Sequence, residues 1–147
     1  MSGKHPKRKP RPGVDVYGRN PLHNATIEGD SASLNALLGA GADPNAQDDN
    51  GWAPLHFAAQ ANAAKMVELL IAAGANVDIR DSNGNTPLST AVFNSRGSGD
   101  VIGLLRRAGA DPFIVNAYGV SPLSLARTIA NYDVAQFFGD VGDANGA

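Results

Sequence analysis

Short apolar segments of two kinds alternate along the chain. The first kind follows a proline: after Pro54, apolar residues stand at Leu55, Ala58 and Ala59, which is helical spacing. Proline suits the first turn of a helix, where its missing N–H group has no partner to lose. The second kind is more apolar and contains Met66, Val67, Leu69, Leu70 and Ile71. Together they predict a unit of two short helices joined by a turn.

This unit recurs along the chain. The proline motif reads GRNPLH, GWAPLH, GNTPLS and GVSPLS, starting at Gly18, Gly51, Gly84 and Gly119, in steps of 33, 33 and 35 residues. A glycine motif keeps the same register, starting at Gly41, Gly74 and Gly109. Its glycines are expected to end the second helices with positive φ. The more apolar helices of the other units contain Leu34, Leu37 and Leu38; Val101, Ile102, Leu104 and Leu105; and Val134, Phe137 and Phe138.

The period of 33 and the proline motif resemble the ankyrin repeat. The resemblance covers about residues 15 to 138, and the second repeat follows the family pattern nearly throughout. The terminal repeats depart from it, with Asn20 in place of threonine, Asn116 in place of aspartate and Ser124 in place of histidine. The resemblance implies an all-α solenoid of helix-turn-helix units with protruding β-hairpin fingers. Repeats are expected at about 15–47, 48–80, 81–115 and 116–139, within a domain 14–139.

Charge is distributed unevenly between a tail and this domain. Residues 1–13 contain five basic residues, no acidic residue and several prolines. The rest keeps seven basic residues against fourteen acidic ones, a net charge near −7. An acidic body repels nucleic acid and attracts basic partners. The basic tail is interpreted as a flexible leader; the alternatives are an electrostatic arm onto nucleic acid, a nuclear import signal, or a segment that folds back on the body. Residues 140–147 are expected to be a flexible C-terminal tail.

Composition and motifs exclude most chemistry. The chain has no cysteine, so disulfides, thiolate zinc sites and cysteine nucleophiles are absent, and a reducing compartment fits best. No apolar run approaches the roughly 18 residues of a membrane helix, and the basic N-terminus is not followed by the apolar stretch of a secretory signal. A cytoplasmic location is expected. His23 and His56 occupy the "PLH" position, where hydrogen bonding within the turn is the expected role. We find no converging catalytic set, so no enzyme activity, cofactor or metal is predicted.

The third repeat is longer than the second by two residues. The surplus falls in FNSRGSGD, residues 93–100, which is rich in glycine and serine. A phosphate-binding loop would need to follow a strand and to have a nearby lysine, and neither condition holds. The segment is therefore expected to be a longer, more mobile loop between two helices.

Trp52, the only tryptophan, marks the expected binding face. The ankyrin resemblance implies that fingers and first helices line a concave groove and that variable finger positions contact a partner. Trp52 holds such a position beside Gly51. An aromatic side chain on a rigid turn is typical of an interface anchor; the alternative is that its ring packs over Pro54 or a neighbouring finger. The predicted partner-binding residues are Tyr17, Arg19, Glu28, Asp49, Asn50, Trp52, Gln60, Arg80, Asn83, Asn85, Phe93, Asn94, Arg96 and Tyr118.

These features predict a non-catalytic module that binds another protein, as a regulatory or scaffolding adaptor. The chain also resembles small stand-alone bacterial ankyrin proteins, some of which are immunity proteins. That resemblance implies an alternative, an antitoxin that caps the active site of a basic toxin such as a nuclease. A further alternative is association with nucleic acid through the basic tail. No small-molecule substrate or membrane partner is expected, and the chain alone is expected to be a monomer.

Overall fold

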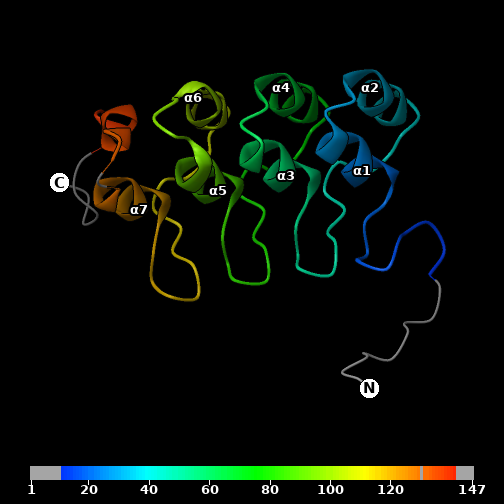
Figure 1. Ribbon diagram of the computed structural model, residues 1–147, viewed down its shortest axis with the longest axis horizontal. Helices are drawn as coiled ribbons and strands as arrows, with labels where there is room; N and C mark the ends of the chain where they lie inside the picture. The colour runs from blue at the N-terminus through cyan, green and yellow to red at the C-terminus, as the bar shows by residue number, and fades with distance from the viewer. Residues whose placement is uncertain (1–10, 130, 142–147) are drawn as a thin grey trace.

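The computed structural model describes residues 11–129 and 131–141 (Figure 1). Helices in these residues follow one another in pairs. In chain order they are α1 (Pro21–Glu28), α2 (Ser31–Gly39), α3 (Pro54–Gln60), α4 (Ala64–Ala72), α5 (Pro87–Asn94), α6 (Asp100–Arg107), α7 (Pro122–Thr128) and the 3₁₀ helix η1 (Val134–Phe138). The inner helices α1, α3, α5 and α7 lie side by side, and the outer helices form a second row (Figure 1). The all-α solenoid predicted from the sequence is confirmed.

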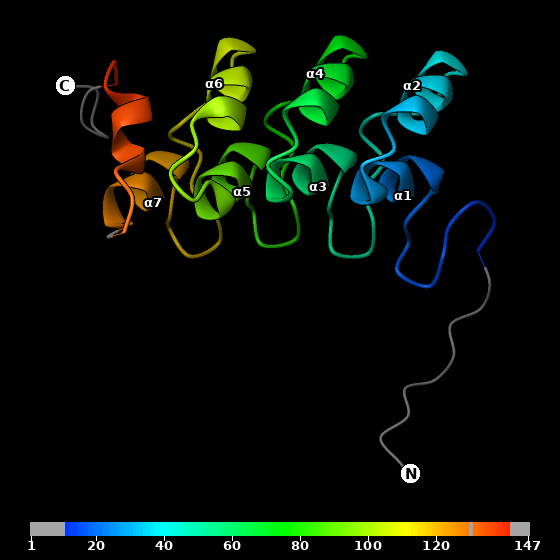
Figure 2. The ribbon, with the colours of Figure 1, turned by 45° about the horizontal axis from the view of Figure 1, so that its top comes forward.

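Four loops extend from the row of inner helices to one side, as Figures 1 and 2 show. We call residues 15–19, 48–52, 81–85 and 116–120 fingers 1 to 4. Each finger closes through two backbone bonds; in finger 2, Asp48 N–H donates to the Trp52 carbonyl oxygen and Gly51 N–H to the Asp48 carbonyl oxygen, both at 2.9 Å. No β-strand is assigned within the residues that the structure describes. The fingers are therefore tight hairpin loops in place of β-hairpins with paired strands.

The inner helices begin with proline in the first turn, as the sequence predicts, and all of them except α3 also have a side-chain cap before it. The side chains of Asn20, Thr86 and Ser121 each accept a hydrogen bond from the backbone three residues on. Such caps satisfy N–H groups that have no partner inside the helix. The predicted stop glycines have positive φ, at 92°, 91° and 95° for Gly41, Gly74 and Gly109. Proline and glycine thus fix the length of each unit.

The core lies between the two rows and is shared among repeats. α3 packs against α1 and α5 as well as against its own partner α4. Leu55, Val67 and Leu70 of the second repeat are fully buried. Small residues such as Ala58 and Ala91, also buried, let neighbouring inner helices approach closely. A single unit cannot bury its own apolar face, so stacking creates the core.

The last repeat ends differently from the others. The helix expected from Val134, Phe137 and Phe138 is a short 3₁₀ helix, and Phe138 is buried against the core. Arg106 closes this end: it stacks on the Phe138 ring at 5.2 Å and binds the Asp140 carboxylate through Nη1 and Nη2 at 2.5 and 2.9 Å. This bond raises the pKa of Arg106 and lowers that of Asp140. The ion pair includes a residue just beyond the predicted domain end at 139.

The loop between α5 and α6 is shorter than predicted. Phe93 and Asn94 belong to the end of α5, which leaves residues 95–99 as the connection. The loop packs against the fourth repeat: a Cβ atom on Gly97 would lie 3.0 Å from Cδ1 of Tyr132, and one on Gly99 would overlap the Phe137 ring. The mobility of this loop stays a prediction. Glycine is required at Gly97 and Gly99 because a larger residue would collide with the side chains of the fourth repeat.

Candidate protein-binding face

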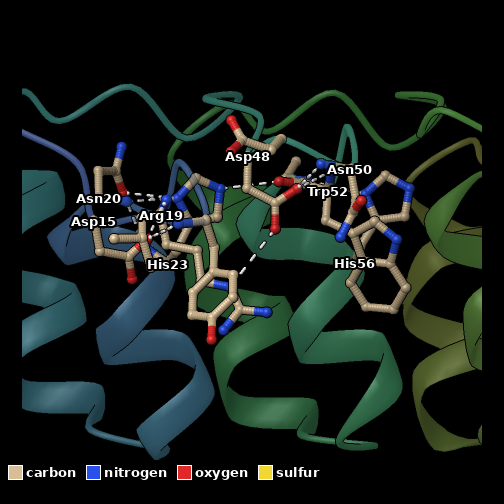
Figure 3. Close-up of polar contacts among 12 residues, drawn as sticks. Asp15, Arg19, Asn20, His23, Asp48, Asn50, Trp52 and His56 are labelled. Carbon is tan, nitrogen blue, oxygen red and sulfur yellow. Dashed lines mark hydrogen bonds and ion pairs between the residues drawn. The ribbon is translucent and has the colours of Figure 1, made fainter. Parts of the chain in front are cut away.

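A single polar side chain organises each finger. In finger 2, Oδ1 of Asp48 accepts hydrogen bonds from the N–H groups of Asn50 at 2.9 Å and Trp52 at 2.8 Å (Figure 3). Equivalent bonds reach Asp15, Asp81 and Asn116 in the other fingers. Asn116 replaces aspartate without loss, because its amide oxygen supplies the same acceptor. The backbone bonds, that from Arg19 first, lower the pKa of Asp15.

The four fingers are joined into one row by backbone hydrogen bonds. Asp49 N–H donates to the Tyr17 carbonyl oxygen at 2.9 Å, Ser82 N–H to that of Asn50 at 3.0 Å, and Ala117 N–H to that of Asn83 at 2.8 Å. The fingers approach closely enough that a Cβ atom on Gly51 would lie 2.6 Å from the Ser82 nitrogen. The backbone of each finger is consequently held in a fixed position relative to its neighbours.

Buried histidines fasten the inner helices to the fingers. Nδ1 of His56 accepts a hydrogen bond from Ala53 N–H at 3.1 Å, which places the ring proton on Nε2. Nε2 then donates to the carbonyl oxygen of Asn85, in the next finger, at 2.9 Å. His23 reaches the Trp52 carbonyl oxygen in the same way (Figure 3). The predicted bond within the turn is present, but the histidines also bond across the repeat boundary. Burial lowers the pKa of His56.

Trp52 is both packed and accessible. Its ring lies 5.5 Å from that of His56 and 4.9 Å from that of Phe57, centroid to centroid, so it packs on α3 of its own repeat. The alternative from the sequence, that the ring packs over Pro54 or a neighbouring finger, stays a prediction. Trp52 remains partly exposed and lines two hollows in the face. It therefore stands on the boundary between them.

The first hollow, which we call the Tyr118 hollow, lies between fingers 2–4 and the inner helices α3, α5 and α7 and has a volume of about 410 Å³. Phe93 and Tyr118 on its wall are 74% and 77% exposed, the most exposed large apolar side chains of the described residues. Among the predicted binding residues it brings together Trp52, Gln60, Asn85, Phe93, Asn94 and Tyr118. It combines exposed aromatic rings with side-chain amides.

The second hollow, the Arg19 hollow, lies between fingers 1–3 and α3 and has a volume of about 420 Å³. The Arg19 guanidinium lies 4.9 Å from the Tyr17 ring and 5.1 Å from that of Phe57. Its Nε atom is 3.6 Å from Oδ2 of Asp48. From the predicted set this hollow contains Arg19, Asn50, Trp52, Gln60 and Asn83.

A family model for ankyrin repeats, in three copies, matches residues 22–116. The chain belongs to the ankyrin repeat family. The match ends where finger 4 begins, although α7 and η1 form a fourth helical pair behind that finger. Comparison with curated proteins gives no match, so a similarity to immunity proteins is not confirmed.

The described part of this ankyrin protein contains neither a membrane-spanning helix nor a metal-binding cluster. Across residues 11–129 and 131–141, no helix has the length and apolar character needed to cross a membrane. The same residues contain no cluster of three or more histidine, aspartate or glutamate side chains suited to a metal ion.

Five of the predicted residues do not line either hollow of the ankyrin face. Tyr17 is one of them, and its ring lies under the Arg19 guanidinium at the edge of the Arg19 hollow. Glu28 lines a separate hollow beside α1 and α2, and Arg96 one beside Tyr132. The Asp49 carboxylate accepts two hydrogen bonds from Arg11, at 2.8 and 2.9 Å, which raises the pKa of Arg11. Arg80 donates to the Val115 carbonyl oxygen at 2.6 Å. Asp49 and Arg80 therefore stabilise the fingers.

Sequence reasoning missed a set of residues at the fourth position of the inner helices. Phe57 lines the Arg19 hollow, while Thr90 and Leu125 line the Tyr118 hollow. The equivalent residue in α1 is Asn24, so the type changes from one ankyrin repeat to the next. That variation, the criterion applied to the fingers, is the signal that finds them.

The tails predicted at residues 1–13 and 140–147 lie mostly outside the described ranges, which omit residues 1–10 and 142–147. Within the described part, Arg11 of the N-terminal tail binds Asp49 of finger 2, and Asp140 of the C-terminal tail binds Arg106.

Proposed function

We propose that this ankyrin protein recognises a partner protein through its fingers and inner helices, as a regulatory or scaffolding adaptor without catalytic activity. The observation that carries the proposal is the Tyr118 hollow, where Phe93 and Tyr118 are about three-quarters exposed beside Trp52. Exposed aromatic side chains surrounded by amides are typical of the centre of a protein interface. Ankyrin repeats as a class bind other proteins. The cysteine-free composition fits a reducing compartment, so the proposal includes a cytoplasmic location.

The rigidity of the face also supports this proposal. The fingers are joined by backbone bonds, and buried histidines fasten two of the inner helices to them. A surface that is already ordered loses little conformational entropy when a partner binds. The face is thus suited to recognition without rearrangement.

An immunity function against a basic toxin remains an alternative that no specific contact favours. The acidic side chains in the two hollows are Asp48 and Asp81, both buried and bonded to finger backbone. The net charge near −7 outside residues 1–13 would speed the encounter with a basic protein, but it is not concentrated in the hollows. Association with nucleic acid through the basic tail depends on residues 1–10, outside the described ranges.

The test is affinity capture from the cells that produce the protein, followed by quantitative mass spectrometry. Three baits are compared: wild type, a Phe93→Ala, Tyr118→Ala double variant, and Phe113→Ala. Phe113 is 40% exposed and lines neither hollow, so it controls for the loss of an exposed aromatic ring. A protein retained by wild type and control but lost by the double variant supports the proposal. Capture that is equal for all three baits would refute binding through this face.

A further inference from the structure

Two arginines show how this chain binds a carboxylate. Arg11 and Arg106 each direct Nη1 and Nη2 at the two oxygens of one carboxylate, that of Asp49 and that of Asp140. Arg106 also stacks on the Phe138 ring, and its Nε atom is buried without a hydrogen bond. When the face of the guanidinium is stacked on an aromatic ring and Nε is buried, Nη1 and Nη2, which we call the fork, remain to bind the carboxylate.

Arg19 lies in the same kind of environment. Its guanidinium stacks on Phe57 and Tyr17, and its Nε atom is buried without a hydrogen bond. The 3.6 Å separation from Oδ2 of Asp48 exceeds hydrogen-bond length, so that pair is only coulombic. Within the described residues, Nη1 and Nη2 of Arg19 make no hydrogen bond. The side chain is 30% exposed and lines the Arg19 hollow.

The surroundings of this fork favour an anion. The wall of the Arg19 hollow adds the neutral polar side chains of Asn50, Gln60, Ser82 and Asn83, which all have hydrogen atoms to donate. Two acidic groups lie close by. The Asp48 side chain is 1% exposed, and Asp15 accepts the backbone N–H groups of Tyr17 and Arg19. Oδ1 of each carboxylate accepts finger N–H groups, and Oδ2 of the buried Asp48 side chain faces Nε of Arg19. Among the residues that line the hollow, the accessible charge is therefore the guanidinium.

We propose that the Arg19 hollow binds an aspartate or glutamate side chain of the partner, held by Nη1 and Nη2 of Arg19. This inference rests on the proposed function. Trp52 and Gln60 line both hollows, so the Arg19 hollow and the Tyr118 hollow adjoin each other. The recognised segment therefore carries an acidic residue near an apolar one. Although the chain outside its tail is acidic, its binding face selects an acidic side chain at this point.

The test is selection of displayed random dodecapeptides on the immobilised full chain. Peptides enriched by wild type are expected to pair aspartate or glutamate with an aromatic or aliphatic residue. Affinity is then measured by fluorescence polarisation for one enriched peptide and for its acid-to-amide analogue. Arg19→Gln or the amide peptide alone is expected to raise Kd about tenfold, the effect of a partly exposed charged hydrogen bond. The two changes together should weaken binding little further, because they remove the same interaction.

Two variants serve as controls. Arg19→Lys keeps the charge but loses the fork, so it should restore only part of the affinity. Arg107→Gln removes one positive charge from the exposed side of α6 and should leave Kd unchanged. Thermal melts monitor the fold, and the amide peptide tests wild type even if Arg19→Gln is unstable.

The outcomes separate this inference from the proposed function. Enriched peptides that lack acidic residues, or an acid-to-amide loss that is equally large in Arg19→Gln, would overturn the carboxylate assignment. The proposed function would then still stand if binding is lost in Phe93→Ala, Tyr118→Ala. Selection that yields no peptide dependent on either hollow would contradict both.

Discussion

Nε2 of His56 lies 2.9 Å from the main-chain carbonyl oxygen of Asn85, so a buried side chain of the second repeat bonds to the finger of the third. His23 forms the same link between the first repeat and the second. Serine replaces histidine at the equivalent Ser89, and in the described residues its side chain has no bond to finger 4. The first three repeats are therefore joined by buried polar bonds, in addition to apolar packing.

Replacing His56 with alanine is expected to destabilise the fold by about 2–4 kcal/mol, because it leaves a cavity and two buried backbone groups without partners. The groups are the N–H of Ala53 and the carbonyl of Asn85. Urea unfolding followed by circular dichroism measures the loss. Lys65→Ala, at an exposed position of α4, is the control and should stay within about 0.5 kcal/mol of wild type. A His56 variant as stable as this control would show that the bond contributes nothing.

The same histidine makes stability depend on pH. Burial lowers its pKa below the ordinary value of about 6.5; the hydrogen bond to the Asn85 carbonyl oxygen and the charges of Asp81 and Asp48 oppose this shift but are smaller. As pH falls, the unfolded chain takes up the proton first. The contribution of His56 is therefore fully present above pH about 6.5 and is lost as pH falls toward the folded-state pKa. The urea concentration at the unfolding midpoint should decrease as the pH is lowered from about 7.5 to 5.5, and this decrease should be smaller in His56→Ala. Equal slopes would exclude His56 as the cause.

Substitutions at two finger glycines distinguish the cost of a left-handed backbone conformation from the cost of a steric clash. Gly51 and Gly119 have φ of 76° and 77°, but only at Gly51 would an added Cβ atom meet a neighbour within 4 Å, with the Ser82 nitrogen at 2.6 Å. Gly119→Ala should cost about 1 kcal/mol from the left-handed conformation alone. Gly51→Ala should cost about 3 kcal/mol or more, because finger 3 must also shift. Similar urea midpoints for the two variants would mean that the fingers can separate freely.

Trp52 and Phe93 are both expected to contribute to binding, but only Trp52 is expected to contribute substantially to the stability of the fold. Trp52→Ala removes ring contacts with His56 and Phe57 and should cost about 1–3 kcal/mol. Phe93→Ala changes a side chain that is 74% exposed and should cost less than about 0.5 kcal/mol. Thermal melts by circular dichroism compare them. A large loss for Phe93→Ala would indicate that its ring is packed in solution.

The repeat itself could be predicted because its signals are local. Proline and glycine act on the backbone of their own turn, so their positions revealed the helix limits and the fold. The roles of Asp49 and Arg80 could not be foreseen, because their partners Arg11 and Val115 are 38 and 35 residues away. A finger residue that bonds its neighbour and one that awaits a partner look alike in a single sequence.

The local sequence pattern of residues 134–138 could not predict whether they form an α-helix or a 3₁₀ helix. One turn of apolar spacing fits an α-helix and a 3₁₀ helix equally well, and the contacts of Arg106 with Asp140 and the Phe137 carbonyl oxygen come from a distant part of the chain. Phe57 was missed for another reason. In the inner helices only residues near the C-terminal ends were predicted to bind, and the Phe57 ring is only 8% exposed, yet it supports Arg19 at the binding face.

The contact between Gly99 and the Phe137 ring limits how freely this array can be re-engineered. The connection in the third repeat is shaped to the aromatic residues of the fourth, so these two units form one inseparable block. A designer could exchange or duplicate the second repeat as a cassette. Extending the array at its C-terminal end would instead require replacing residues 95–99 and 132–140 together, since each shapes the other.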